Sequence, residues 1–191
     1  RKIKLRKQKV RTIYQPDHSG CGVLYQEQAR TVLATLYNSP EDSITPVNKI
    51  HYTLEDIEGI SAKGGGNGDV TIFYSTRHIE KSFAENDTAK LFFETRGVLL
   101  HELTHAYQLE PQGIGSYGTN RVFWAFIEGM ADAVRVANGG FDGPNAVRKE
   151  ETTWTVIGRQ VISSSGCATI KILNSCRKFN RSTAGGDSLV V

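Results

Sequence analysis

The stretch at residues 97–108, GVLLHELTHAYQ, places His101 and His105 four residues apart, with Glu102 directly after the first histidine. On a helix each residue turns the chain by about 100°, so a step of four returns nearly to the same side. The two imidazoles then point to one place and can bind a tetrahedral zinc ion. Glu102 can reach a water on that metal and act as general base, as in metal-assisted peptide hydrolysis.

The alternative is an ordinary helix whose polar face carries the HExxH motif by chance. Such a chance match is expected in about one chain of this size in a hundred. The surroundings argue against a solvated face, because Val98, Leu99, Leu100 and Leu103 are all apolar. A buried His-Glu-His trio without a metal would carry a large desolvation cost. The pattern therefore favours a metal site.

A third ligand is expected farther along the chain, since catalytic zinc usually binds three protein ligands and one water. No histidine follows His105, but FIEGMADAV carries Glu128, 23 positions later, and Asp132 one helical turn beyond. Glu128 is predicted to be a metal ligand, and Asp132 to hydrogen-bond the free ring nitrogen of a histidine. The alternative is a solvated acidic pair, which the apolar character of this helix opposes.

The composition suits one domain with a true core, because 39% of the 191 residues are apolar. No run of about 18 apolar residues exists, so no transmembrane segment is expected. The net charge of +3 comes largely from residues 1–11, RKIKLRKQKVR. No aromatic-interleaved basic patch follows, so a solvated terminal segment is favoured and no nucleic-acid partner is expected. The oligomeric state is left open.

The cysteines and the start of the chain say little about the compartment. Cys21, Cys167 and Cys176 are odd in number and form no CxxC, which argues against a disulfide framework and against cysteine-ligated zinc. For these cysteines, one disulfide bond and three free thiols are both left open as alternatives. The sequence begins without a methionine or an apolar leader, but a processed secreted chain would look the same.

The periodicity of apolar residues predicts an α+β chain. Residues 17–22, DHSGCG, are expected to form a turn, and residues 61–68, SAKGGGNG, a flexible hairpin or lip. The glycine run is not a phosphate loop, because no GK[ST] follows it. Strands are predicted at residues 3–14, 48–57 and 69–75, and helices at 24–37, 76–83, 88–109 (with Thr88 as N-cap) and 120–138.

Two motifs together resemble known families. HExxH followed by an ExxxD helix is similar to the glutamate-ligand zincins, and residues 97–108 with FIEGMADAVRVANGGF more closely resemble the basic secretory protein family of plants, fungi and bacteria. VTIFYSTRHIEK resembles the strand and helix before that family's active-site helix, and the likeness is strongest over residues 20–145. It implies that residues 1–191 form a single α+β, zincin-like metallopeptidase domain. In that domain a small mixed sheet packs on the HExxH helix and the following EGMAD helix.

The resemblance also implies the roles of the site residues. His101, His105 and Glu128 would bind Zn²⁺, and Glu102 would be the general base that hydrolyses a peptide or protein substrate. The location would be secreted, periplasmic or at the cell surface. In such folds the strand before the active-site helix often forms the upper edge of the cleft, so residues 69–75 are expected to pair with an extended substrate. A plain core strand is the alternative.

Two functions are compatible with these sequence features. The leading one is a zinc metallopeptidase, and the alternative is a secreted binding protein on a zincin scaffold that keeps a structural or vestigial zinc. An open fourth zinc position and an oxyanion-stabilising side chain favour the enzyme. That side chain is not identified, because no tyrosine follows Tyr117, and Tyr107 and Tyr117 are weak candidates.

Residues 149–176 and 184–191 are atypical of the family, whose pattern returns at residue 177. Reading the codons one base earlier, with suitable silent bases, restores family-like residues in both stretches. We therefore predict that a reading-frame shift separates the printed tail from the natural protein, the alternative being a divergent tail. Resequencing the gene and weighing the natural protein test this, and a mass equal to that of the printed chain would contradict the shift.

Overall fold

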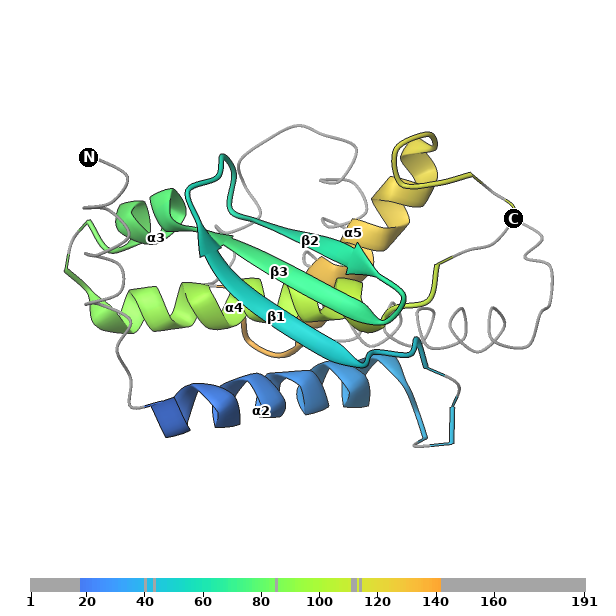
Figure 1. Ribbon diagram of the computed structural model, residues 1–191, viewed down its shortest axis with the longest axis horizontal. Coiled ribbons are helices and arrows are strands. Elements are labelled where there is room, and N and C mark those ends of the chain that lie inside the picture. Colours follow the sequence, from blue (N-terminus) through green and yellow to red (C-terminus); the bar gives the residue numbers. More distant parts are fainter. Residues whose placement is uncertain are drawn as a thin grey trace.

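The fold is described from a computed structural model for residues 18–141, except 40, 43, 85, 111, 112 and 114. The α+β class is confirmed by a mixed sheet and helices. The predicted strand at 3–14 and the tail stretches 149–176 and 184–191 lie outside the described residues. No described helix has the length and apolar character needed to cross a membrane. The elements in chain order are α2 (His18–Leu36), β1 (Lys49–Glu55), β2 (Ser61–Gly66), β3 (Asp69–Ser75), α3 (Thr76–Ser82), α4 (Thr88–Tyr107) and α5 (Arg121–Ala137) (Figure 1).

The sheet has three strands in the order β1-β3-β2. β1 runs parallel to β3, and β2 runs antiparallel to it on the other side. Asn67 and Gly68 join β2 to β3 with φ angles of 54° and 83°. Positive φ at both central residues is typical of the type I′ turns that match the twist of a hairpin. The hairpin predicted for residues 61–68 is therefore present, although its first six residues form a strand and not a flexible lip.

The prediction that residues 69–75 form the open edge of a cleft is wrong. β3 is the central strand, and its alternate residues Val70, Ile72 and Tyr74 are buried. The edge strand beside α4 is β2. Its glycines have low strand propensity, so the sequence pattern did not predict a strand there. Gly65 is nevertheless required in this hairpin, since a Cβ there would meet the carbonyl oxygen of Asp69.

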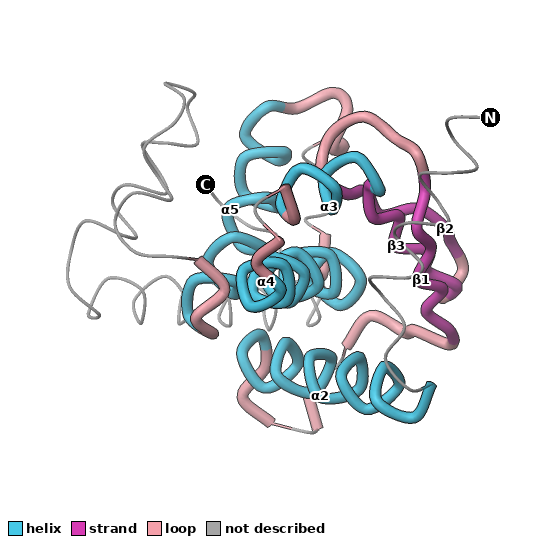
Figure 2. Tube along the Cα trace, turned by 90° about the vertical axis from the view of Figure 1, so that its left-hand side faces the viewer, coloured by secondary structure: helices cyan, strands magenta, loops and turns pink. Residues whose placement is uncertain are grey.

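The helices gather on one face of the sheet, with α4 against the strands and α2 along α4 (Figure 2). The α4 residues of the main core cluster are those at positions 99, 100, 103 and 106, which form one stripe on a helix. This stripe faces the core, so the histidines at 101 and 105 lie on a neighbouring face. The main core cluster is made of Val32, Leu36, Tyr37, Val70, Ile72, Leu99, Leu100, Leu103, Ala106, Met130 and Val134.

Two predicted helix starts need correction. The N-cap of α4 is Asp87, one residue before Thr88, because its carboxylate accepts the backbone N–H of Lys90 at 3.0 Å. Aspartate and threonine both cap helices, so the sequence could not choose between them. Helix α2 begins at His18, so residues 18–22 are helical and not the predicted turn. Its glycines cost only about 1 kcal/mol each within a helix, which tertiary packing can offset.

A partly buried ion pair holds α5 against α4. Arg135 of α5 donates from Nη2 to Glu94 of α4 at 2.9 Å, and from Nε to the carbonyl oxygen of Gly140 at 2.9 Å. Glu94 also lies 3.0 Å from His78 Nε2. A buried charge needs such partners to offset its lost hydration. The helices approach closely at Gly97, where a Cβ would collide with Arg135 and Gly140.

We expect Gly97→Ala to destabilise the protein, because the new Cβ would lie 2.5 Å from the Gly140 carbonyl oxygen. Because this contact with the backbone is so short, the loss in free energy of unfolding should lie near the upper end of the ~1–3 kcal/mol typical of overpacking. This loss exceeds the ~1 kcal/mol by which the helix propensity of alanine is more favourable than that of glycine. Chemical denaturation measures the free energy of unfolding.

Gly118→Ala is the control, because a Cβ at that position meets no atom within 4 Å. Its free energy of unfolding should stay within about 0.5 kcal/mol of the wild type. A Gly97→Ala variant as stable as this control would contradict the close contact between α4 and α5.

Candidate metal centre

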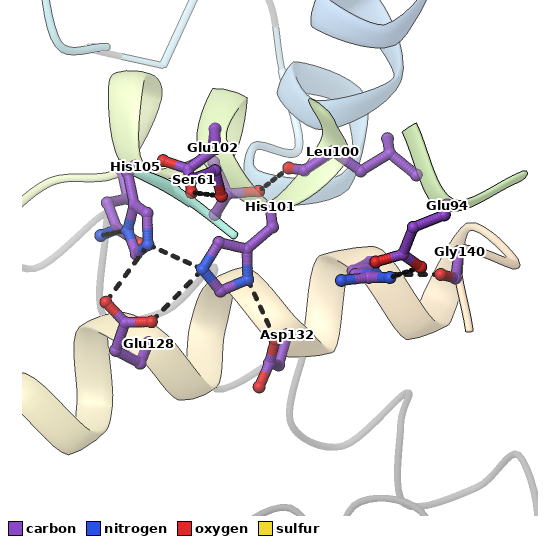
Figure 3. A network of polar contacts seen from close by, with 12 residues as sticks. Ser61, Glu94, Leu100, His101, Glu102, His105, Glu128, Asp132 and Gly140 are labelled. Atoms are coloured by element: carbon purple, nitrogen blue, oxygen red, sulfur yellow. Dashed lines mark hydrogen bonds and ion pairs between the residues drawn. The ribbon is translucent and has the colours of Figure 1, made fainter. Parts of the chain in front are cut away.

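The three predicted ligand residues come together where α4 faces α5 (Figure 3). His101 Nε2 and His105 Nε2 are 3.0 Å apart. The carboxylate of Glu128 lies opposite them, with one oxygen 3.3 Å from His101 Nε2 and the other 3.4 Å from His105 Nε2. The four-residue step on α4 presents both histidines on one side, as predicted, and α5 brings the glutamate to them.

The spacing of these atoms suits a tetrahedral cation. Bond lengths of about 2.0–2.1 Å to zinc would place neighbouring ligand atoms about 3.3 Å apart. The three measured separations, from 3.0 to 3.4 Å, are close to that value. Two imidazoles and one carboxylate are also ligands that zinc and related transition metals accept. The residues therefore fit a divalent metal ion of this class.

Asp132 lies where the sequence predicted it, one turn after Glu128. His101 Nδ1 is 2.9 Å from Asp132 Oδ1, although this carboxylate side chain is 50% exposed. Burial lowers the pKa of His101, but hydrogen bonds to Asp132 and Glu128 outweigh it and raise that pKa to about 9. Burial raises the pKa of Glu128, but hydrogen bonds from His101 and His105 bring it well below its usual range. The carboxylates thus favour a positive charge among the imidazoles.

Glu102 lines the same cleft as the two histidines and is hydrogen-bonded to the sheet. Its side chain is almost fully buried, with 4% exposure. Oε1 accepts a hydrogen bond of 2.5 Å from the hydroxyl of Ser61, the first residue of β2. Oε2 is buried and has no hydrogen-bond partner among the described residues. One carboxylate oxygen is therefore held by β2, while the other makes no hydrogen bond with the described residues.

These residues line a common cleft of about 710 Å³. The first residues of β2 with the preceding Ile60 form one part of its lining, and α4 and α5 contribute the ligands and Glu102. Arg135 and Phe141 also line the cleft, with the guanidinium stacked 4.1 Å from the ring centre. The cleft therefore joins the candidate metal ligands to the exposed edge of the sheet.

The two tyrosines considered from the sequence have different positions. Tyr117 lines the cleft, is 49% exposed, and donates a hydrogen bond of 2.6 Å to Glu128 Oε1. Tyr107 instead packs against the main core, and its carbonyl oxygen accepts the hydroxyl of Tyr37 at 2.6 Å. Of these two, only Tyr117 has its hydroxyl beside a candidate ligand.

Sequence reasoning missed Ser61 and Gln108 and gave Tyr117 too little weight. Gln108 lies three residues after His105, and its side-chain nitrogen is 2.9 Å from His105 Nδ1. Helical spacing alone could have found this contact. Ser61 and Tyr117 reach the site from a distant strand and a loop, so no local pattern points to them.

Comparison with known proteins gives one match. No curated protein matches the chain, and no solved structure does. A family model described as peptidase of plants and bacteria, BSP, matches residues 15–163. This span covers most of the chain, including both helices of the site and the first part of the atypical stretch 149–176. The match confirms the resemblance drawn from the two motifs, and the chain belongs to the BSP family of peptidases of plants and bacteria.

Proposed function

We propose that this peptidase is zinc-dependent, with His101, His105 and Glu128 as the zinc ligands and Glu102 as the general base. One observation carries the proposal. Three ligand atoms converge at tetrahedral spacing in the same cleft as a buried carboxylate whose Oε2 has no partner among the described residues. In this proposal the sheet, α4 and α5 make up a zincin-like catalytic domain.

The chemistry follows from the positions of the side chains. Zinc bound to this set supplies a polarised water and a Lewis acid for the scissile carbonyl. Glu102 removes the proton from the attacking water through Oε2, while Ser61 holds Oε1 in place. The hydroxyl of Tyr117 is the best-placed described donor for a developing oxyanion, because it already lies beside Glu128.

The substrate would bind as an extended peptide along β2. Among the described strands, β2 pairs with β3 on one side only and forms an edge of the sheet. Ser61, Ala62 and Lys63 line the cleft, so a peptide added to the free edge would pass the metal ligands. Backbone hydrogen bonds would hold the chain and leave side chains to choose the sequence. β2 thus takes the role that the sequence suggested for residues 69–75.

The alternative, a binding protein with a structural zinc, is less well supported. Structural zinc sites usually have four protein ligands, whereas catalytic sites have three and leave one position for water. Within the described residues the cluster offers three ligands. We also propose that the protein acts outside the cytoplasm, as the family resemblance implies, and cell fractionation would test this.

We expect one zinc ion per chain in the purified protein, and its loss in His101→Ala and His105→Ala. Each substitution removes one of only three described ligands, so tight binding should disappear. Elemental analysis after dialysis measures the zinc content. His51→Ala is the control, since His51 is an exposed residue of β1 outside the cluster. Stoichiometric zinc in both ligand variants would place the metal elsewhere.

Glu102→Gln should keep the zinc and lose hydrolysis, because the amide cannot act as a base. The rate should fall by about 10²–10⁴-fold, the usual contribution of general acid–base catalysis. Cleavage of a quenched fluorescent peptide library, with zinc content measured on the same sample, tests both parts. Glu58→Gln provides an exposed control away from the cleft.

The two functions give different results in this experiment. Loss of zinc from Glu102→Gln, or an unchanged rate, would rule out the general-base role. A wild-type protein that holds one zinc but cleaves no peptide would instead support the binding protein.

A further inference from the structure

Gln108 is held at both of its backbone groups. It ends α4, where its N–H donates to the carbonyl oxygen of Thr104 at 2.8 Å. Its own carbonyl oxygen accepts the hydroxyl of Thr45 at 3.1 Å. The side chain is buried, with 4% exposure, and runs toward His105. The amide therefore has a fixed place beside the imidazole.

The contact at His105 Nδ1 matters because Nε2 of the same ring points to Glu128 and His101. A neutral imidazole carries one proton, so metal binding through Nε2 puts that proton on Nδ1. Nδ1–H then needs an acceptor, which an amide oxygen provides and an amide NH₂ does not. Gln108 Oε1, buried and without a partner among the described residues, can supply it.

A half-turn of the terminal amide brings Oε1 to the position from which the nitrogen now contacts Nδ1. In either orientation one amide atom, Oε1 or Nε2, contacts Nδ1 and the other is left unpaired. The amide by itself therefore favours neither orientation, and the protonation of the ring decides between them. Metal bound at Nε2 therefore selects the orientation with Oε1 toward Nδ1. This arrangement matches the hydrogen bond that His101 Nδ1 makes with Asp132.

We propose that Gln108 is a positioning residue of the metal centre, which accepts the Nδ1–H of His105 through Oε1 and so holds Nε2 toward the metal. The proposal rests on the zinc site proposed above. Gln108 would do for His105 what Asp132 does for His101. The two acceptors differ, since Asp132 is a half-exposed carboxylate and Gln108 is a neutral, buried amide.

The amide also spares the site a further charge. Glu102, Glu128 and Asp132 already bring three carboxylates to the same cleft. Another carboxylate at position 108 would lie in a buried place, where it would need further partners. A neutral acceptor fixes the ring of His105 without this cost.

The test replaces Gln108 with methionine, which has a similar length and no strong acceptor. Hydrogen-bonded partners of metal ligands typically contribute 10- to 100-fold in affinity, so zinc affinity of Gln108→Met should fall by that factor. Competition with a chromophoric chelator measures it. Gln108→Glu, which restores an acceptor oxygen, should recover most of the affinity. Asp132→Ala is the matched comparison on the other histidine and should lose a similar factor.

Two further readouts separate positioning from a structural role. The absorption bands of bound Co²⁺ report ligand geometry and should shift in Gln108→Met. The rise in melting temperature on adding zinc should shrink, while the metal-free protein melts close to the wild type, because ligand stabilisation depends on affinity. Wild-type affinity and an unchanged Co²⁺ spectrum in Gln108→Met would overturn this role and leave the zinc site standing. A wild-type protein that binds no zinc would overturn both.

Discussion

The close packing of α5 on α4 holds the candidate metal centre together, because the histidines lie on one helix and Glu128 on the other. The contact depends on Gly97, which leaves room for Arg135 and Gly140, and on the ion pair between Arg135 and Glu94. The three ligand atoms must meet within a few tenths of an ångström to share one ion. Such precision requires helices that cannot slide, and the partly buried ion pair, with Arg135 also bonded to the backbone of Gly140, provides it.

A single hydrogen bond connects the edge strand β2 with Glu102, the proposed general base. Ser61 begins β2, the strand proposed to bind the peptide, and its hydroxyl holds Glu102 Oε1. A peptide that pairs with this strand would therefore lie beside the carboxylate that we propose as the base. Oε2 of the same carboxylate is buried and has no hydrogen-bond partner among the described residues. In the proposed mechanism, substrate binding and proton transfer would thus both depend on the start of β2.

The histidines are supported differently, and the difference follows from their positions. His101 is turned toward α5, where Asp132 reaches it from partly exposed surface. His105 lies near the end of α4, where the neighbouring side chain, Gln108, is buried. A carboxylate is tolerable at the exposed position because water shares its charge, whereas a buried position favours a neutral acceptor. His101 therefore has a charged partner on α5, whereas His105 has an amide partner at the end of its own helix, α4.

Local periodicity was enough to predict which candidate side chains share one face of a helix. The four-residue step that brings His101 and His105 together, and the placement of Glu128 and Asp132 one turn apart, depend only on about 100° of rotation per residue. Strand order was not predictable in this way, because pairing joins residues far apart in the chain. The sequence therefore favoured residues 69–75 as the open edge, whereas the tertiary structure puts the glycine-rich β2 there. Ser61 and Tyr117 likewise reach the site only through the fold, since no repeat along the chain relates them to the histidines.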